Sequence, residues 1–280
     1  MVVPLRVQPE SFRLLSAGCI SRGAQVLIRL SAFLLLTIVA VFPAGAAEVP
    51  STLDAAKLAT IKSVGIISAV GDTLNISTNG PFLRLSMSQK VRPISDMGID
   101  DALEAFVRQK LSTRYKIEPV QYGRGQFSGV KDSGYLRKND LPPLEKLVNS
   151  LSATVDAYLI ISKDLVPFGL DEKVARPGLN IGRGGFHEDQ YVADAFIKVS
   201  LIDARTSVLL AQASYPPPIS RLWGGKVERL PLDGALWPDD AGNFTQLQHD
   251  ELKKVLTDDL EAIVSRLVEQ QGLIPAHTQQ

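Results

Sequence analysis

Cysteine is almost absent from this sequence, in which Cys19 is the only one among 280 residues. Histidine is scarce as well, with three residues, and 30 basic side chains balance 30 acidic ones. A single thiol cannot close an internal disulfide, and a Cys-ligated metal site needs several thiolates. The balanced charge provides no basic surface for nucleic acid or anionic lipid. Binding to nucleic acid or to anionic lipid is therefore not predicted.

The N-terminus differs in composition from the rest of the chain. Four arginines precede an apolar run from Leu30 to Phe42, and small residues follow. This order of basic, apolar and small residues predicts a secretory signal peptide over residues 1–46, cleaved near Ala46 or Ala47. A membrane anchor is the alternative, but the run is shorter than the roughly 20 residues that a spanning helix needs.

Removal of that segment changes what the chain can do chemically. Cys19, four arginines and one glutamate are lost with it, which leaves 26 basic and 29 acidic side chains and a net charge of −3. We expect a periplasmic protein without a thiol, which excludes disulfides and cysteine nucleophiles. The run Ser16–Cys19 faintly resembles a lipoprotein cleavage box, but polar residues precede it, so lipidation is not predicted.

The strongest strand pattern runs from Tyr191 to Tyr215. Apolar and polar residues alternate up to Ile202, and turn-forming residues 203–207 precede a second apolar run. This predicts a hairpin with one face on a core. Apolar runs at 62–70 and 156–162 have the length of buried strands, and Asn79-Gly80 predicts a second hairpin.

Three segments have helical periodicity. The first is Ile99 to Tyr115, with Asp100 or Asp101 as its cap, and the second begins at Asp140. The third begins with a capping box at Thr245 and is expected to end at Gly272. The order predicts an α/β (α+β) fold with a mixed β-sheet of about 6–8 strands packed by about three helices. Residues 47–61 form a lead-in segment to a single domain, 62–280, with an irregular loop at 214–244.

Several motifs resemble one known α/β domain. They are Lys62-Ser63-Val64-Gly65-Ile66-Ile67, Val155-Asp156-Ala157-Tyr158-Leu159-Ile160 and Leu201-Ile202-Asp203-Ala204-Arg205-Thr206-Ser207-Val208-Leu209. The chain resembles the domain shared by curli-secretion lipoproteins, lipoprotein activators of penicillin-binding proteins and the amino-terminal domain of the Tol-system propeller protein. The stretch Val64 to Asp72 is also similar to uncharacterised exported bacterial proteins. Ser207 stands where that family usually has glycine, which puts the left-handed turn in question.

No pattern in the chain completes a catalytic or metal-binding set. His187-Glu188-Asp189 are adjacent, whereas metal sites gather ligands from separate elements. Ser128 and Lys131 have the S-x-x-K spacing of penicillin-binding enzymes but lack the two further motifs. Gly182-Arg183-Gly184-Gly185 does not open a helix, so we interpret it as a hairpin tip rather than a phosphate site. We assign no catalytic residue, cofactor or metal.

The most suggestive surface lies in the 214–244 loop. The loop contains Trp223, Arg221, Lys226 and Trp237. Tryptophan and arginine are residue types that anchor interfaces, and prolines stiffen the segment. The alternative is that both tryptophans pack onto the sheet and close its core. The resulting hypothesis is a soluble periplasmic, non-enzymatic protein that binds an envelope partner. A hydrolase or small-ligand-binding protein of the envelope, with a site assembled from scattered residues, remains the alternative.

Overall fold

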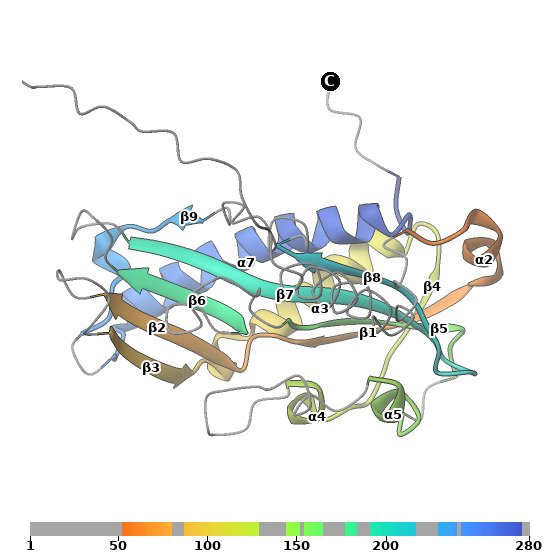
Figure 1. The fold of residues 1–280 in the computed structure, drawn as a ribbon, viewed down its shortest axis with the longest axis horizontal. Coiled ribbons are helices and arrows are strands. Elements are labelled where there is room, and N and C mark those ends of the chain that lie inside the picture. Colours follow the sequence, from red (N-terminus) through yellow and green to blue (C-terminus); the bar gives the residue numbers. More distant parts are fainter. Residues whose placement is uncertain are drawn as a thin grey trace, which may run out of the picture. The chain divides into compact units, whose positions relative to one another are not determined.

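A nine-stranded mixed sheet forms the centre of the computed structural model (Figure 1). The structure describes residues 52–79, 87–128, 144–151, 154–164, 177–183, 191–216, 229–239 and 242–275. The predicted signal peptide, with Ala46 and Ala47, lies outside these ranges. The strands are β1 (Ser63–Ala69), β2 (Thr73–Asn79), β3 (Met87–Pro93), β4 (Lys116–Glu118), β5 (Ala157–Lys163), β6 (Gly178–Arg183), β7 (Tyr191–Asp203), β8 (Leu209–Tyr215) and β9 (Leu230–Pro231).

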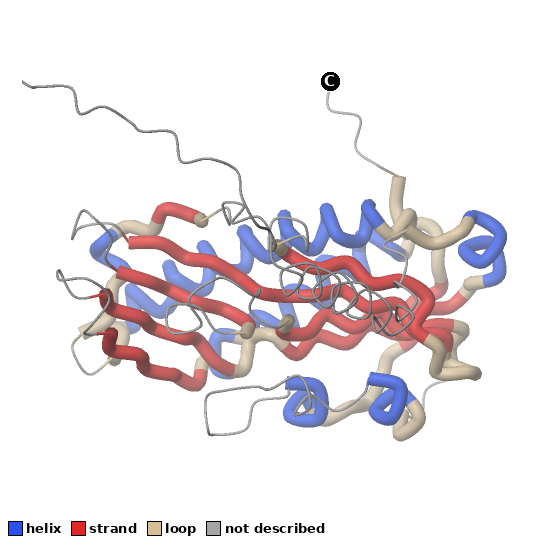
Figure 2. The backbone as a smooth tube through the Cα atoms, in the orientation of Figure 1, coloured by secondary structure: helices blue, strands red, loops and turns tan. Residues whose placement is uncertain are grey.

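Helices cover both faces of this sheet. They are α2 (Ala55–Thr60), α3 (Ile99–Leu111), α4 (Arg124–Ser128), α5 (Leu144–Val148) and α7 (Gln246–Gln270), with short 3-10 turns η1 (Ser95–Met97) and η2 (Gly234–Leu236). The long helices α3 and α7 pack on one face in the main core. The short helices α4 and α5 pack on the opposite face in a smaller core, as Figure 2 shows. The described part of the chain holds no helix long and apolar enough to span a membrane.

The strand β7 joins two half-sheets placed end to end. Residues 191–196 pair with β6, whereas residues 197–203 pair with β5 on the same side of the strand. β1 and β2 follow one another in the same manner beside β5 and β6, interrupted by Val70, Gly71 and Asp72. The predicted hairpin of residues 191–215 is confirmed, and its first strand is the one that spans both halves of the sheet.

The sheet has more strands than the predicted 6–8. The sequence pattern did not predict β6, because its glycines favour a turn. Gly182 and Arg183, interpreted as part of a hairpin tip, lie in this strand and pair with β7. The Asn79-Gly80 hairpin is present, but its second strand begins at Met87, which pairs with Asn79. The fold class itself is confirmed, since parallel and antiparallel pairs share one sheet.

The final helix follows its predicted capping pattern. Thr245 accepts a hydrogen bond from the Gln248 backbone, and the Gln248 side chain accepts one from the Thr245 backbone, which completes the capping box. At the other end Gly272 has φ 77°, the left-handed conformation that glycine adopts without steric cost. One stripe of α7 is buried in the main core, including Leu252, Leu256, Leu260, Ile263, Val264 and Leu267.

The turn between β7 and β8 is left-handed without glycine. Ser207 has φ 56°, and its hydroxyl donates a 2.6 Å hydrogen bond to Oδ1 of Asn149. That bond offsets part of the roughly 1–2 kcal/mol that this conformation costs a residue with a Cβ atom.

Two substitutions at Ser207 separate these contributions. Ser207→Ala removes the hydrogen bond and keeps the strained backbone, so we expect its free energy of unfolding to fall by about 1 kcal/mol. Ser207→Gly also removes the bond but relieves the strain, so we expect a change close to zero. Urea unfolding of both variants measures the difference, and equal losses would show that the backbone at Ser207 is not strained.

Candidate functional site

Ionisable and hydroxyl side chains gather where β1 ends and α3 begins. We call this group the junction cluster: Ser68, Asp72, Thr73, Asp100, Glu104, Tyr122 and Lys163. It lies at the interruption between the two half-sheets. The stretch Val64 to Asp72 and the helix-start aspartates Asp100 and Asp101 lie apart in the sequence, and no local pattern connects them. Only the fold brings these segments together with Lys163 at the end of β5.

Asp100 is the most constrained member of the cluster. Its Oδ1 accepts from the Ser68 hydroxyl at 2.7 Å, from the Val70 amide at 2.9 Å and from the Gly71 amide at 3.1 Å. The side chain is buried, so no water replaces these donors. The prediction that Asp100 or Asp101 caps α3 is wrong. The N-cap is Gly98, with φ 63° and no side-chain cap, because the Asp100 carboxylate turns toward β1 instead.

Glu104 lies one helical turn after Asp100 and contacts the same part of β1. Its Oε1 accepts from the Ser68 amide at 3.2 Å and from the Tyr122 hydroxyl, which is also 2.9 Å from the Ser68 carbonyl. Burial raises the pKa of Glu104, and the hydrogen bonds from Tyr122 and Ser68 act against that shift. Burial and the Glu104 hydrogen bond also raise the pKa of Tyr122. Tyr122 therefore stays a neutral phenol, which can donate a hydrogen bond but cannot serve as a base.

Lys163 connects the two half-sheets from the end of β5. Its side chain is 1% exposed, forms an ion pair with Asp72 and donates a 2.6 Å hydrogen bond to Oγ1 of Thr73. The aliphatic stem fills the space where a Cβ atom at Gly178 would come within 2.9 Å of Cδ. Burial lowers the pKa of Lys163, and the charges of Asp72 and Asp100 oppose that shift.

The contact between Lys163 and Thr73 resembles the amine–hydroxyl pair of some hydrolases. In such a pair the amine must be neutral to take the hydroxyl proton. The adjacent Asp72 carboxylate favours the ammonium form, which has no lone pair for that purpose. This geometry is therefore suited to fastening β1–β2 to β5–β6 rather than to nucleophilic catalysis.

A second polar group lies at the other end of β1. Oδ2 of Asp156 accepts from the amides of Lys62 and Ser63 at 2.9 and 3.0 Å, and the Lys62 hydrogen bond lowers the pKa of Asp156. Oδ1 of Asp203 accepts from the amides of Arg205 and Thr206 in the β7–β8 turn. These aspartates belong to the motifs that resemble the envelope-lipoprotein domain. In this structure Asp156 holds the start of β1, and Asp203 holds the β7–β8 turn.

Asp194 on β7 is a buried carboxylate whose negative charge is only weakly offset by neighbouring groups. Burial raises its pKa to about 6; the Arg229 charge opposes the shift and the Asp259 charge adds to it. The Arg229 Nε lies 3.7 Å from Oδ2, and no group in the described part of the chain donates a hydrogen bond to Oδ1. Ionised Asp194 therefore destabilises the fold near neutral pH.

The substitution Asp194→Asn tests this destabilisation. The folded pKa lies above the ordinary value of 3.8, so the stability contribution is complete below pH 3.8 and is lost as pH rises through about 6. At pH 7 the variant should gain about 2–3 kcal/mol in free energy of unfolding. At pH 4 the two proteins should differ little. Urea unfolding between pH 4 and 7 measures both values, and a gain independent of pH would contradict the assigned titration.

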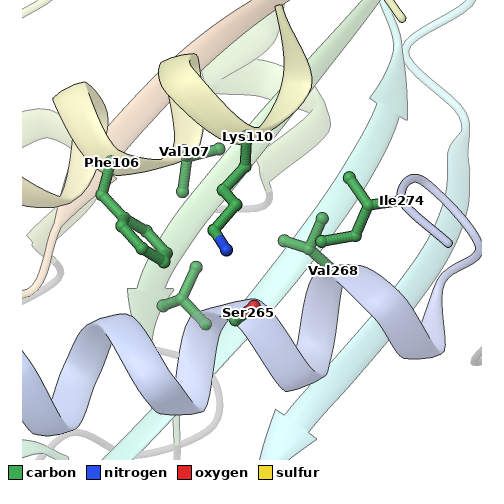
Figure 3. A pocket seen from close by; sticks show the side chains of 7 residues that line it. Phe106, Val107, Lys110, Ser265, Val268 and Ile274 are labelled. Carbon is green, nitrogen blue, oxygen red and sulfur yellow. The ribbon is translucent and has the colours of Figure 1, made fainter. Parts of the chain in front are cut away.

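A shallow apolar groove lies between α3 and α7 (Figure 3). Phe106, Val107 and Lys110 line it from α3, and Val264, Ser265 and Val268 line it from α7, with Ile274 at one end. Lys110 Nζ lies 5.4 Å from the centre of the Phe106 ring. The lining side chains leave no enclosed space in the groove, so it cannot hold a substrate-sized molecule.

The residues predicted to bind a partner lie mostly outside the described ranges. Trp223, Arg221 and Lys226 are among those that the structure does not describe. Trp237 is half-buried against the main core, and its ring centre lies 5.4 Å from that of Tyr191. Its backbone carbonyl also accepts from Gln248 at 2.9 Å, which attaches this part of the loop to α7.

The other sequence candidates do not converge on one site. His187 and the glycines 184–185 lie outside the described ranges, as does Lys131. His249, at the start of α7, lies 3.2 Å from Asp96 and 3.3 Å from Asp250. In the part of the chain that the structure describes, no three His, Cys, Asp or Glu side chains are grouped to hold a metal ion.

Comparisons with known proteins return distant structural neighbours. No family model matches the chain, and no curated protein matches it. A Xanthomonas campestris protein of the family DUF330 covers 80% of this chain and 89% of its own, with 10% identity and a TM-score of 0.33. A neuraminyllactose-binding hemagglutinin homolog from Helicobacter pylori covers 81% and 91%, with 7% identity and a TM-score of 0.30. A lipoprotein from Neisseria meningitidis covers 73% and 99%, with 13% identity and a TM-score of 0.24.

These similarities are too low to transfer a function. The curli-secretion, penicillin-binding-protein activator and Tol-system families are not among the three neighbours described, so that resemblance stays a prediction. The chemistry of the site has to be argued from the residues of this chain alone.

Proposed function

We propose that this chain is an exported, non-enzymatic protein of the cell envelope that acts by binding a partner in the periplasm. The observation that supports this proposal is the junction cluster. Its charged side chains are engaged by backbone amides or by opposite charges, as Asp100 and Lys163 illustrate. Such groups brace the fold, and a base or nucleophile would instead need a free lone pair directed at a substrate.

The sequence supplies the argument for export. The basic, apolar and small-residue order of residues 1–46 is typical of a signal peptide, with cleavage near Ala46 or Ala47. A chain that loses Cys19 with that segment carries no thiol that an oxidising compartment could modify. Fractionation of cells that express the full chain tests this step, and recovery of the uncleaved protein in the cytosol would contradict it.

We place partner binding in the loop that contains Arg221, Trp223 and Lys226. These residues come after β8 in the sequence. Tryptophan and arginine are types favoured at the centre of interfaces, and Lys226 adds a second positive charge beside them. Trp237 has a different role in this proposal because it packs against Tyr191.

Cross-linking in the native cells, followed by mass spectrometry, tests the proposed site. We expect Trp223→Ala to lose the captured partner while its free energy of unfolding stays within about 0.5 kcal/mol of the unsubstituted protein. Trp237→Ala is the matched control, and removal of its packing should cost about 2–4 kcal/mol. Unchanged capture by Trp223→Ala would contradict this placement of the partner.

A hydrolase is the second candidate, because Lys163 and Thr73 form an amine–hydroxyl contact at 2.6 Å. If that pair were nucleophilic, a small ester probe such as p-nitrophenyl acetate would acylate Thr73, and Thr73→Ala would abolish the reaction. We expect equal background hydrolysis by the unsubstituted protein and Thr73→Ala, because the ion pair with Asp72 favours the charged form of the Lys163 amine.

A further inference from the structure

The strand β8 differs from the other strands at the borders of the sheet. In the described part of the chain, β3, β4, β8 and β9 each pair with one neighbour only. β3 contains Lys90, Arg92 and Pro93, and β4 contains Lys116 and Glu118. β9 has only two residues. Charged side chains, proline, bulges and short length are the usual means by which edge strands avoid pairing with another chain.

β8 has no charge and no proline and is longer than β9, and the one bulge in its pairing with β7 lies near its start, which leaves Ala211 to Tyr215 in regular register. Its seven residues are Leu-Leu-Ala-Gln-Ala-Ser-Tyr. The strand is held in place along its length, because its register with β7 runs from Ile197↔Tyr215 to Ile202↔Leu209, with one irregularity near Leu201. Ala211 and Ala213 are buried in the main core. A rigid, uncharged strand of this length is a preformed template for a further strand.

We propose that β8 pairs antiparallel with β8 of a second copy of this chain, which joins two sheets across a twofold axis. Gln212 is the central residue of the strand, so the axis would place the two Gln212 side chains opposite each other. A primary amide carries both a donor and an acceptor and is therefore complementary to itself. The strand has no charged residue, so self-pairing creates no like-charge contact.

The same twofold self-pairing is unfavourable for β3, the other seven-residue strand at a border of the sheet. Lys90 is the central residue of β3, so pairing of two β3 strands would place two ammonium groups opposite each other. Charge complementarity thus favours β8 as the self-associating strand. Strand pairing over seven residues buries less area than a standard stable interface, so we expect a weak dimer with a Kd on the order of micromolar.

Charge substitution at Gln212 tests the proposed axis. Sedimentation velocity over a range of concentrations should show a monomer–dimer equilibrium for the full chain. Gln212→Lys and Gln212→Glu each place like charges at the axis, and each should raise the Kd at least tenfold. An equimolar mixture of the two variants should restore dimerisation, because opposite charges then meet. Gln109→Lys, the same change at an exposed position of α3, is the matched control.

The scarcity of cysteine provides a second, independent test. In a chain that carries Cys19→Ser, Gln212→Cys introduces the only thiol. Opposite residues of an antiparallel pair have Cβ atoms about 4.5–5.5 Å apart, close enough for a disulfide after small adjustments. We expect mild oxidation to yield a covalent dimer for Gln212→Cys. The Gln109→Cys variant should form such a dimer far more slowly.

Three results would overturn the proposal. One is a monomer at all concentrations up to about a hundred times the expected Kd. Another is equal weakening of the dimer by Gln212→Lys and Gln109→Lys. The last is equal rates of covalent dimer formation by the two cysteine variants. Because the cysteine test needs only a neutral substitution, it applies even if a charged side chain at Gln212 prevents folding.

Discussion

Replacement of Asp100 with alanine should lower the free energy of unfolding by about 3–5 kcal/mol. The carboxylate oxygen accepts three hydrogen bonds, two from backbone amides and one from the Ser68 hydroxyl, and the side chain is only 3% exposed. Its removal leaves the Val70 and Gly71 amides buried without an acceptor. Each such loss costs about 1–3 kcal/mol, and the costs are not fully additive.

The neighbouring aspartate provides the control for this experiment. Asp101 lies in the same helical turn, but its side chain is 73% exposed and pairs with Arg124 at the surface. Asp101→Ala should therefore cost less than about 1 kcal/mol. Urea unfolding of both variants at pH 7 measures the contrast. Similar losses for the two would show that charge near the start of α3, rather than the three hydrogen bonds of Asp100, stabilises this region.

The second large effect is an asymmetry within the ion pair of Asp72 and Lys163. Asp72→Asn leaves a buried ammonium group without its counter-charge and should cost about 3–5 kcal/mol. Lys163→Met removes the charge from the low-dielectric site and leaves Asp72, which is 26% exposed, able to contact water. That substitution should change the free energy of unfolding by no more than about 1 kcal/mol.

A double substitution completes this comparison. Asp72→Asn combined with Lys163→Met should be more stable than Asp72→Asn alone, because the charge that caused the loss is no longer present. Chemical unfolding of the four proteins gives the coupling free energy directly. If Lys163→Met alone is as damaging as Asp72→Asn, the contribution of Lys163 comes from its packing against Gly178 rather than from its charge.

Local patterns predicted the elements that depend on neighbouring residues. The β7–β8 hairpin, the capping box of α7 and the left-handed Gly272 follow from residues close in sequence, and all are present. Ser207 shows that a serine can take the place of glycine in a left-handed turn. It does so with a hydrogen bond to Asn149, which no local pattern could reveal because Asn149 lies 58 residues away.

The junction cluster could not be predicted in the same way. A helix-start aspartate such as Asp100 has the same sequence pattern whether it caps its own helix or turns toward another element. The choice depends on the break at residues 70–72, which places two amides in front of it. Lys163 was likewise indistinguishable from a lysine that ends a strand in solvent. In both cases tertiary contacts decide the role of the side chain.

If the chain is exported as proposed, the parallel pairing of β1 with β5 has a consequence for its folding. Ser63, at the start of β1, meets its hydrogen-bond partner Asp156, which comes 93 residues later. If the chain crosses the membrane from its N-terminus, the apolar β1 segment emerges long before the strand that covers it. Such a long-range parallel pairing forms slowly, and the partly folded chain exposes apolar surface that is prone to aggregation. We therefore expect the nascent protein to depend on a periplasmic holding chaperone until β5 has been translocated.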